Sequence, residues 1–120
     1  MAGVARLAAM ATPTTPIHHR SATEQAAMIA AREISSRELL EHYVGRIETL
    51  NPAVNAVVTL DLDRARAAAD AADAATAAGT ASGALHGVPI TVKDALAVEG
   101  VRSSGGASEL AEHVATDDAD

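Results

Sequence analysis

The single lysine of this chain, Lys93, is the residue whose type and setting most favour a chemical role. Every other Lys or Arg position is an arginine. Lys93 follows Val88–Val92, where apolar residues alternate with other types at the period of a β-strand, so we expect it at a strand end. A neutral lysine accepts a proton and thereby activates a nucleophile. The local pattern by itself is more typical of a solvated lysine at a strand end.

Few other side chains are candidates for a catalytic or ligand-binding role. Asp94 is expected to bond backbone N–H groups at a turn. Ser103 and Ser104 lie in a Gly-rich turn that begins ten residues after Lys93, and hydroxyl groups of this type can act as nucleophiles. The histidines show no spacing typical of metal ligands. They are interpreted as a solvated pair, a residue beside an apolar helix face and two unpartnered residues: His18-His19, His42, His86 and His113.

Composition excludes several classes of protein. The net charge of -7 and the single aromatic residue, a tyrosine, argue against nucleic-acid binding. The longest stretch without a charged residue, Ala74–Val92, contains Gly, Pro, Ser and Thr and is no membrane helix. The apolar run Leu7–Ala11 is too short for a signal peptide, and the absence of cysteine fits a reducing compartment. We therefore expect a cytoplasmic protein with no nucleic-acid or membrane partner.

The apolar content predicts a small core for this length. Of the 120 residues, 30 are alanine and only 24 are Leu, Ile or Val, which is near the level at which chains fold poorly alone. A buried alanine also contributes much less to folding than a buried leucine. The composition thus indicates part of a larger unit rather than a self-sufficient domain.

Two helices that position the later segments are indicated near the N-terminus. Residues 1–20 show no period and are expected to be a disordered leader. Ser residues three positions before Glu predict capping boxes that open one helix over 22–32 and a second from residue 36. Asn51-Pro52 is expected to stop the second helix. Its apolar stripe consists of Leu39, Leu40, Tyr43, Val44, Ile47 and Leu50.

A third helix follows a short extended segment. Val54–Leu60 is expected to be a strand or extended chain, and Leu62–Ala78 to be a helix that Gly79 ends. Arg66 and Asp70 are spaced to pair along this helix. Because the helix is almost all alanine, it needs a surface to lie on, and the chain is expected to offer little.

Three segments together resemble the amidase signature family. Leu85–Asp94 is similar to its motif G-P-L-x-G-[VI]-P-[IV]-x-[VI]-K-D. Ile34–Leu40 is similar to L-S-S-x-E-L-V, and Arg46–Val58 to R-I-x-x-L-N-P-x-L-N-A-x-V. The lysine segment is specific, the helix motifs are weaker, and the resemblance covers about residues 22–120.

The resemblance implies an α/β fold with a mixed central sheet, of which residues 21–120 would be the N-terminal part. It also implies a serine hydrolase of carboxamides that uses a nucleophilic serine, a second serine joined by a cis peptide bond, and a lysine, without cofactor or metal. Only the lysine maps onto this sequence, at Lys93. The family's Gly- and Ser-rich signature lies several tens of residues beyond that lysine, whereas this sequence has 27 residues after it. We therefore expect a truncated domain that is inactive alone.

The same resemblance argues against Ser103 and Ser104 as nucleophiles, because they fall where the family has its T-T-x-G-S turn. Two alternatives stay open. One is the amidase-like subunit of the tRNA-dependent amidotransferase, although Asn51–Val58 looks more like stand-alone amidases. The other is a non-catalytic helical interaction module. The substrate amide and the oligomeric state are not predicted.

Overall fold

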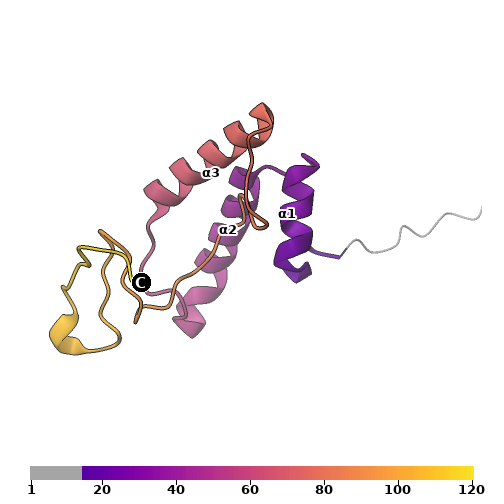
Figure 1. Cartoon of the computed structure of the whole chain (residues 1–120). Helices are drawn as coiled ribbons and strands as arrows, with labels where there is room; N and C mark the ends of the chain where they lie inside the picture. Colours follow the sequence, from indigo (N-terminus) through magenta and orange to yellow (C-terminus); the bar gives the residue numbers. More distant parts are fainter. Residues whose placement is uncertain (1–14) are drawn as a thin grey trace, which may run out of the picture.

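The structure is a computed structural model that describes residues 15–120, and it is helical. Figure 1 shows α1, α2 and α3 grouped together, followed by a long irregular segment that runs to the C-terminus. The elements in chain order are η1 (Ile17–His19), α1 (Ala22–Ala30), α2 (Ser36–Val54), α3 (Leu62–Ala78) and η2 (Ser108–Leu110). No helix in this part of the chain is both long and apolar enough to cross a membrane.

The predicted strand at Val88–Val92 is wrong for this structure, and the α/β class is not confirmed. Among residues 15–120, the one β-type pairing is an isolated antiparallel bridge between Arg102 and Val114. A strand needs a neighbouring strand for its backbone N–H and C=O groups, and residues 15–120 place none beside this segment. The segment has no regular secondary structure instead. Ile90 is 76% and Val92 47% exposed, whereas Val88 is half-buried.

The first two α-helices begin where the capping boxes predicted. Ser21 accepts a hydrogen bond from the Glu24 N–H, and the Glu24 carboxylate accepts one from the Ser21 N–H. Ser35 and Glu38 make the same reciprocal pair at the start of α2. Each pair gives partners to N–H groups that a helix start leaves unbonded.

The predicted stop of α2 at Asn51-Pro52 is wrong, because the helix continues through the proline to Val54. Pro52 lacks one N–H donor, but the last turn closes through a 2.7 Å hydrogen bond from the Asn55 N–H to the Asn51 carbonyl. Asn55 adopts a left-handed conformation with φ +47°. The Asn51 amide group then bonds both the N–H and the C=O of Val57, which directs the chain away from the helix.

The alanine helix α3 finds its surface on α2, contrary to expectation. Leu40 and Val44 of the predicted apolar stripe pack with Ala69, and the apolar residues Leu62 and Ala65 lie against this cluster. The small alanine side chains allow the two helices to approach closely. The stripe is buried at its N-terminal end only, because Leu50 is 48% exposed while Leu39, Leu40 and Val44 are buried.

Ion pairs across α2 and α3 replace the pair that was predicted within α3. Arg66 donates from Nε to Oε1 of Glu41 at 2.8 Å rather than to Asp70. Asp70 instead accepts both its bonds from Nη1 of Arg37, at 2.8 and 2.9 Å. Arg37 also donates to Glu41, so the four side chains form one network. The contacts between α2 and α3 thus form in place of the i,i+4 pair that the spacing within α3 predicted.

The expected leader, residues 1–20, falls mostly outside the described residues. Its last part is structured, because Ile17–His19 form a 3-10 helix. The side-chain amide of Gln25, which is 4% exposed, donates to the carbonyl oxygens of Ile17 and Arg20 at 3.1 Å each. Ordered structure therefore begins before residue 21.

Candidate active-site segment

Lys93 follows the irregular segment Val88–Val92 and begins a turn. Its side chain is exposed, and its carbonyl oxygen accepts a 2.8 Å hydrogen bond from the Leu96 N–H. No hydrogen bond or ion pair of the Lys93 amine occurs among residues 15–120. The structure therefore fixes the backbone of this residue and leaves its amine in solvent.

Asp94 bonds the Ser103–Ser104 turn, as the sequence predicted. Its Oδ1 accepts from the Ser104 N–H at 3.0 Å, and its Oδ2 accepts from the Ser104 hydroxyl at 2.7 Å. Its carbonyl oxygen accepts from the Ser103 hydroxyl at 2.8 Å. The hydrogen bonds from Ser104, the hydroxyl bond first, lower the pKa of the Asp94 carboxyl group.

Ser103 and Ser104 are not arranged as nucleophiles in this structure. The Ser103 hydroxyl donates to a backbone carbonyl oxygen, which is not a base. The Ser104 hydroxyl donates to the Asp94 carboxylate, whose lowered pKa makes it a weak base for activating a serine. The turn behind them is tight, with Gly105 and Gly106 at φ +58° and +81°. The serines thus hold the turn against Asp94.

The segment that leads to Lys93 is anchored on α2 and α3. The His86 ring donates from Nε2 to the Ala72 carbonyl of α3 at 3.0 Å. Gly87 has φ +76° and lies directly against Ser36 of α2, where a side chain would overlap the serine hydroxyl. That hydroxyl oxygen is buried and has no hydrogen-bond partner among the described residues. Only glycine fits at residue 87 without displacing its neighbours.

The N-terminus of α2, against which Gly87 packs, is closed by a carboxylate from α3. Asp73 accepts hydrogen bonds from the N–H groups of Ser36 and Arg37, at 2.6 and 3.1 Å. With the capping box, this satisfies each N–H of the first turn of α2. No sequence pattern indicated this contact, because the partners are 36 and 37 residues apart.

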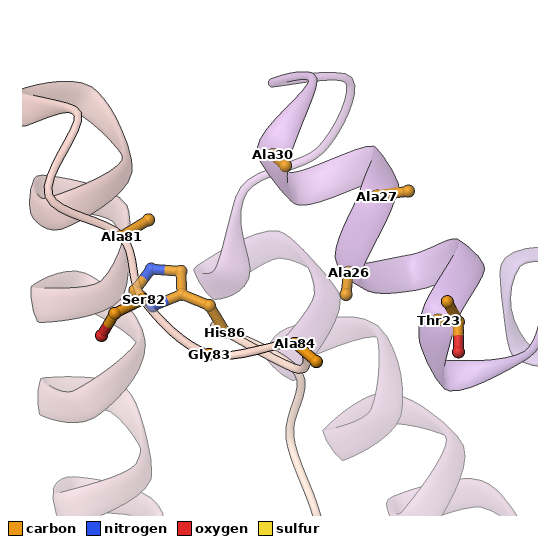
Figure 2. Close-up of a pocket in the computed structure, with 9 residues that line it drawn as sticks. All are labelled: Thr23, Ala26, Ala27, Ala30, Ala81, Ser82, Gly83, Ala84 and His86. Carbon is orange, nitrogen blue, oxygen red and sulfur yellow. The ribbon is translucent and has the colours of Figure 1, made fainter.

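A cavity of about 350 Å³ lies between α1 and the loop residues 81–86. Figure 2 shows the residues that line it. Its walls are mainly the alanine side chains of both elements, and its polar side chains come from Thr23, Ser82 and His86. Neither Lys93 nor Asp94 lines it. The cavity therefore lies apart from the candidate chemistry.

The histidines form one contact that sequence reasoning missed. Nδ1 of His18 lies 3.2 Å from Nε2 of His42, and the two rings stack with their centres 5.3 Å apart. His18 is therefore paired rather than solvated. Burial, together with the nearby Arg46, lowers the pKa of His18. Among residues 15–120, no three His, Asp or Glu side chains are grouped to hold a metal ion.

Comparison with known proteins finds one family. The Amidase family model matches residues 38–120, which include the lysine segment. An "Acylamidase" of Rhodococcus erythropolis is 39% identical over 103 residues, which cover 86% of this chain and 22% of that protein. A glutamyl-tRNA(Gln) amidotransferase subunit of Alkalilimnicola ehrlichii is 47% identical over 103 residues, covering 86% and 21%. The corresponding subunit of Thiobacillus denitrificans is 46% identical over 94 residues, covering 78% and 19%. The chain thus spans about a fifth of the length of the curated relatives it matches.

Proposed function

The chain belongs to the amidase family, and we propose that it supplies the lysine-bearing N-terminal part of an enzyme that hydrolyses carboxamides. The observation that carries this proposal is the match over residues 38–120, which contains Lys93 within the motif of the family. The relative called an acylamidase supports an amide as substrate. The reaction would convert a carboxamide and water into a carboxylate and ammonia or an amine.

Lys93 is proposed as the base of this reaction. In its neutral form the amine accepts a proton from a bridging serine, which in turn accepts the proton of the nucleophilic serine. The nucleophile then attacks the amide carbonyl, and the C–N bond breaks as the proton passes to the leaving amine. Water hydrolyses the resulting acyl-enzyme, which releases the carboxylate and restores the serine. Both serines belong to the Gly- and Ser-rich signature, which residues 1–120 do not contain, so we propose that this chain alone does not hydrolyse amides.

Further protein that covers Val88–Lys93 would favour the neutral amine that a base requires. Desolvation favours the neutral form of an amine, and Lys93 is exposed in the structure. Val88–Val92 has no regular structure, so it is free to pair, and it carries two exposed apolar residues, Ile90 and Val92. We propose that it becomes a strand of a mixed sheet, with residues 21–120 as the first part of an α/β domain, when a neighbouring strand pairs with it.

A second candidate is the amidotransferase component, because two relatives with that name are 47% and 46% identical to the chain. Their name includes a tRNA, so the expectation of no nucleic-acid partner does not fit that alternative. For this segment itself, we keep the proposal that it makes no contact with nucleic acid, since its net charge is -7. A cytoplasmic location, suggested by the absence of cysteine, also remains a proposal.

The test uses a chimeric enzyme, the joined enzyme, in which residues 1–120 replace the matching segment of the Rhodococcus erythropolis acylamidase. We expect the joined enzyme to release nitroaniline from p-nitroacetanilide, and the 120-residue chain alone to release none. Lys93→Ala should lower kcat by about 10²-fold or more, the usual scale for a general base. Glu109→Gln, at another exposed charged residue, is the control and should leave kcat unchanged.

Full activity of the Lys93→Ala form would overturn the proposal. To distinguish the two candidate functions, residues 1–120 also replace the matching segment of the Alkalilimnicola ehrlichii amidotransferase subunit. If that joined amidotransferase supports amidotransfer in its complex while the joined acylamidase is inert, the second candidate is correct.

A further inference from the structure

A set of hydrogen bonds holds the turn that carries Lys93, and it involves two serines that the proposed reaction does not use. Asp94 accepts three bonds of 2.7 to 3.0 Å from Ser103 and Ser104. We propose that these three residues are a clasp that positions Lys93 for its role as a base. This inference rests on the proposed function and names further residues that serve the same site.

The clasp restrains the backbone directly on the C-terminal side of the lysine. The carbonyl oxygen of Asp94 is bonded by the Ser103 hydroxyl, and the carbonyl oxygen of Lys93 is bonded by the Leu96 N–H at 2.8 Å. Two successive carbonyl groups therefore have fixed directions. Because the Lys93 side chain leaves from the Cα atom before them, its starting direction is fixed as well.

The serine side of the clasp is itself held. The Ser103 N–H donates to the His113 carbonyl at 3.0 Å, while the hydroxyl of the same residue donates to Asp94. Arg102 forms the antiparallel bridge with Val114, and the buried Ala115 donates its N–H to the Val101 carbonyl at 3.1 Å. Ser103 therefore connects the lysine turn to a paired region of chain.

The lysine needs a fixed backbone because no hydrogen bond or ion pair in the described part of the chain holds its side chain. A long flexible side chain gains catalytic precision only if its origin is fixed, and a misplacement of about 1 Å can cost about 10²-fold in rate. The three residues are half-buried, so their hydrogen bonds are partly shielded from competing water. Ser103 and Ser104 then act through Asp94, as positioning residues.

The clasp can be measured in the 120-residue chain itself, by amide hydrogen exchange followed by NMR. Asp94→Ala should speed exchange of the Ser104 N–H by about tenfold, the scale of one lost hydrogen bond. Ser104→Ala should leave this N–H bonded to Oδ1 and produce a smaller change. Asp117→Ala is the matched control, since Asp117 also accepts from a hydroxyl, that of Thr116, but lies outside the clasp.

The consequence for catalysis is measured in the joined enzyme. Asp94→Ala should lower kcat by about 10- to 100-fold with KM nearly unchanged. Asp94→Asn should recover part of the loss, because its amide oxygen still accepts the Ser104 N–H. A merely structural role would instead lower the amount of folded enzyme without this split between kcat and KM.

The outcomes separate the two proposals. The clasp would be overturned if Asp94→Ala left exchange of the Ser104 N–H unchanged in the 120-residue chain, or left kcat unchanged in the joined enzyme. The proposed function would still stand in that case if Lys93→Ala lost activity. Full activity of Lys93→Ala would overturn the proposed function, whereas the exchange measurement would still report whether the clasp forms.

Discussion

Replacing Gly87 with alanine should weaken the docking of the lysine segment on the helices more than its backbone conformation alone explains. Gly87 has φ +76°, and an added Cβ would overlap the Ser36 hydroxyl, lie 3.2 Å from the Ser36 Cβ and lie 3.3 Å from Cδ1 of Ile29. Both neighbours are buried, with Ser36 0% and Ile29 1% exposed. Neither can move aside without disturbing its own packing.

The magnitude divides into two parts. An L-residue in the left-handed region costs about 1–2 kcal/mol relative to glycine. Overpacking of a buried contact costs about 1–3 kcal/mol more. We therefore expect Gly87→Ala to lower the free energy of unfolding by about 2–5 kcal/mol.

Gly79→Ala is the matched control. Gly79 has nearly the same φ, +73°, but an added Cβ there meets no atom within 4 Å. It should lower the free energy of unfolding by the conformational part alone, about 1–2 kcal/mol. Adding Ser36→Ala to Gly87→Ala should recover part of the extra loss, because it removes the overlapping hydroxyl group.

The assay is urea unfolding of the 120-residue chain, followed by circular dichroism at the helix band. The difference between the Gly87 and Gly79 variants reports the contact with α2. Equal losses in the two variants, or no recovery on adding Ser36→Ala, would refute the close packing of the lysine segment on α2.

Three further predictions concern the helices. Hydrogen bonds from Arg66 and Arg37 lower the pKa of Glu41 from its ordinary value of 4.5 to about 2. Ionised Glu41 therefore stabilises the fold fully above pH 4.5, and this stabilisation is lost as the pH falls toward 2. Glu41→Gln should make the urea midpoint depend less on pH over that range. Asp73→Ala should lower the free energy of unfolding by about 0.5–2 kcal/mol in the same assay, because it leaves the N–H groups of Ser36 and Arg37 at the start of α2 without partners. Leu39→Ala, at a fully buried side chain, should cost about 2–5 kcal/mol, while Leu50→Ala, at a side chain 48% exposed, should cost about 0.5 kcal/mol or less; equal costs would contradict the burial pattern.

Local signals in the sequence predicted local structure well. The starts of α1 and α2 follow from Ser and Glu three residues apart, and the end of α3 follows from Gly79, which adopts φ +73°. Asp94 was also correctly expected to bond a turn. Each of these contacts joins residues close in sequence, where residue type and spacing determine the partner.

Contacts between distant residues were not predictable in this way. Arg66 bonds Glu41, which is 25 residues away, rather than Asp70, which is four positions along its own helix. His18 and His42 are 24 residues apart, and no pattern relates them. The strand expected at Val88–Val92 failed for the same reason, because alternation predicts a half-buried segment but cannot supply its partner strand.

The proposal that Lys93 is the base of an amide hydrolysis can be tested by chemical rescue of the Lys93→Ala joined enzyme. Free propylamine or butylamine can occupy the space of the missing side chain and accept the proton in its place. We expect kcat to rise with the concentration of the uncharged amine, and the unmodified joined enzyme to show no such response. Activity of the Lys93→Ala enzyme that equals the unmodified enzyme without added amine would contradict the claim.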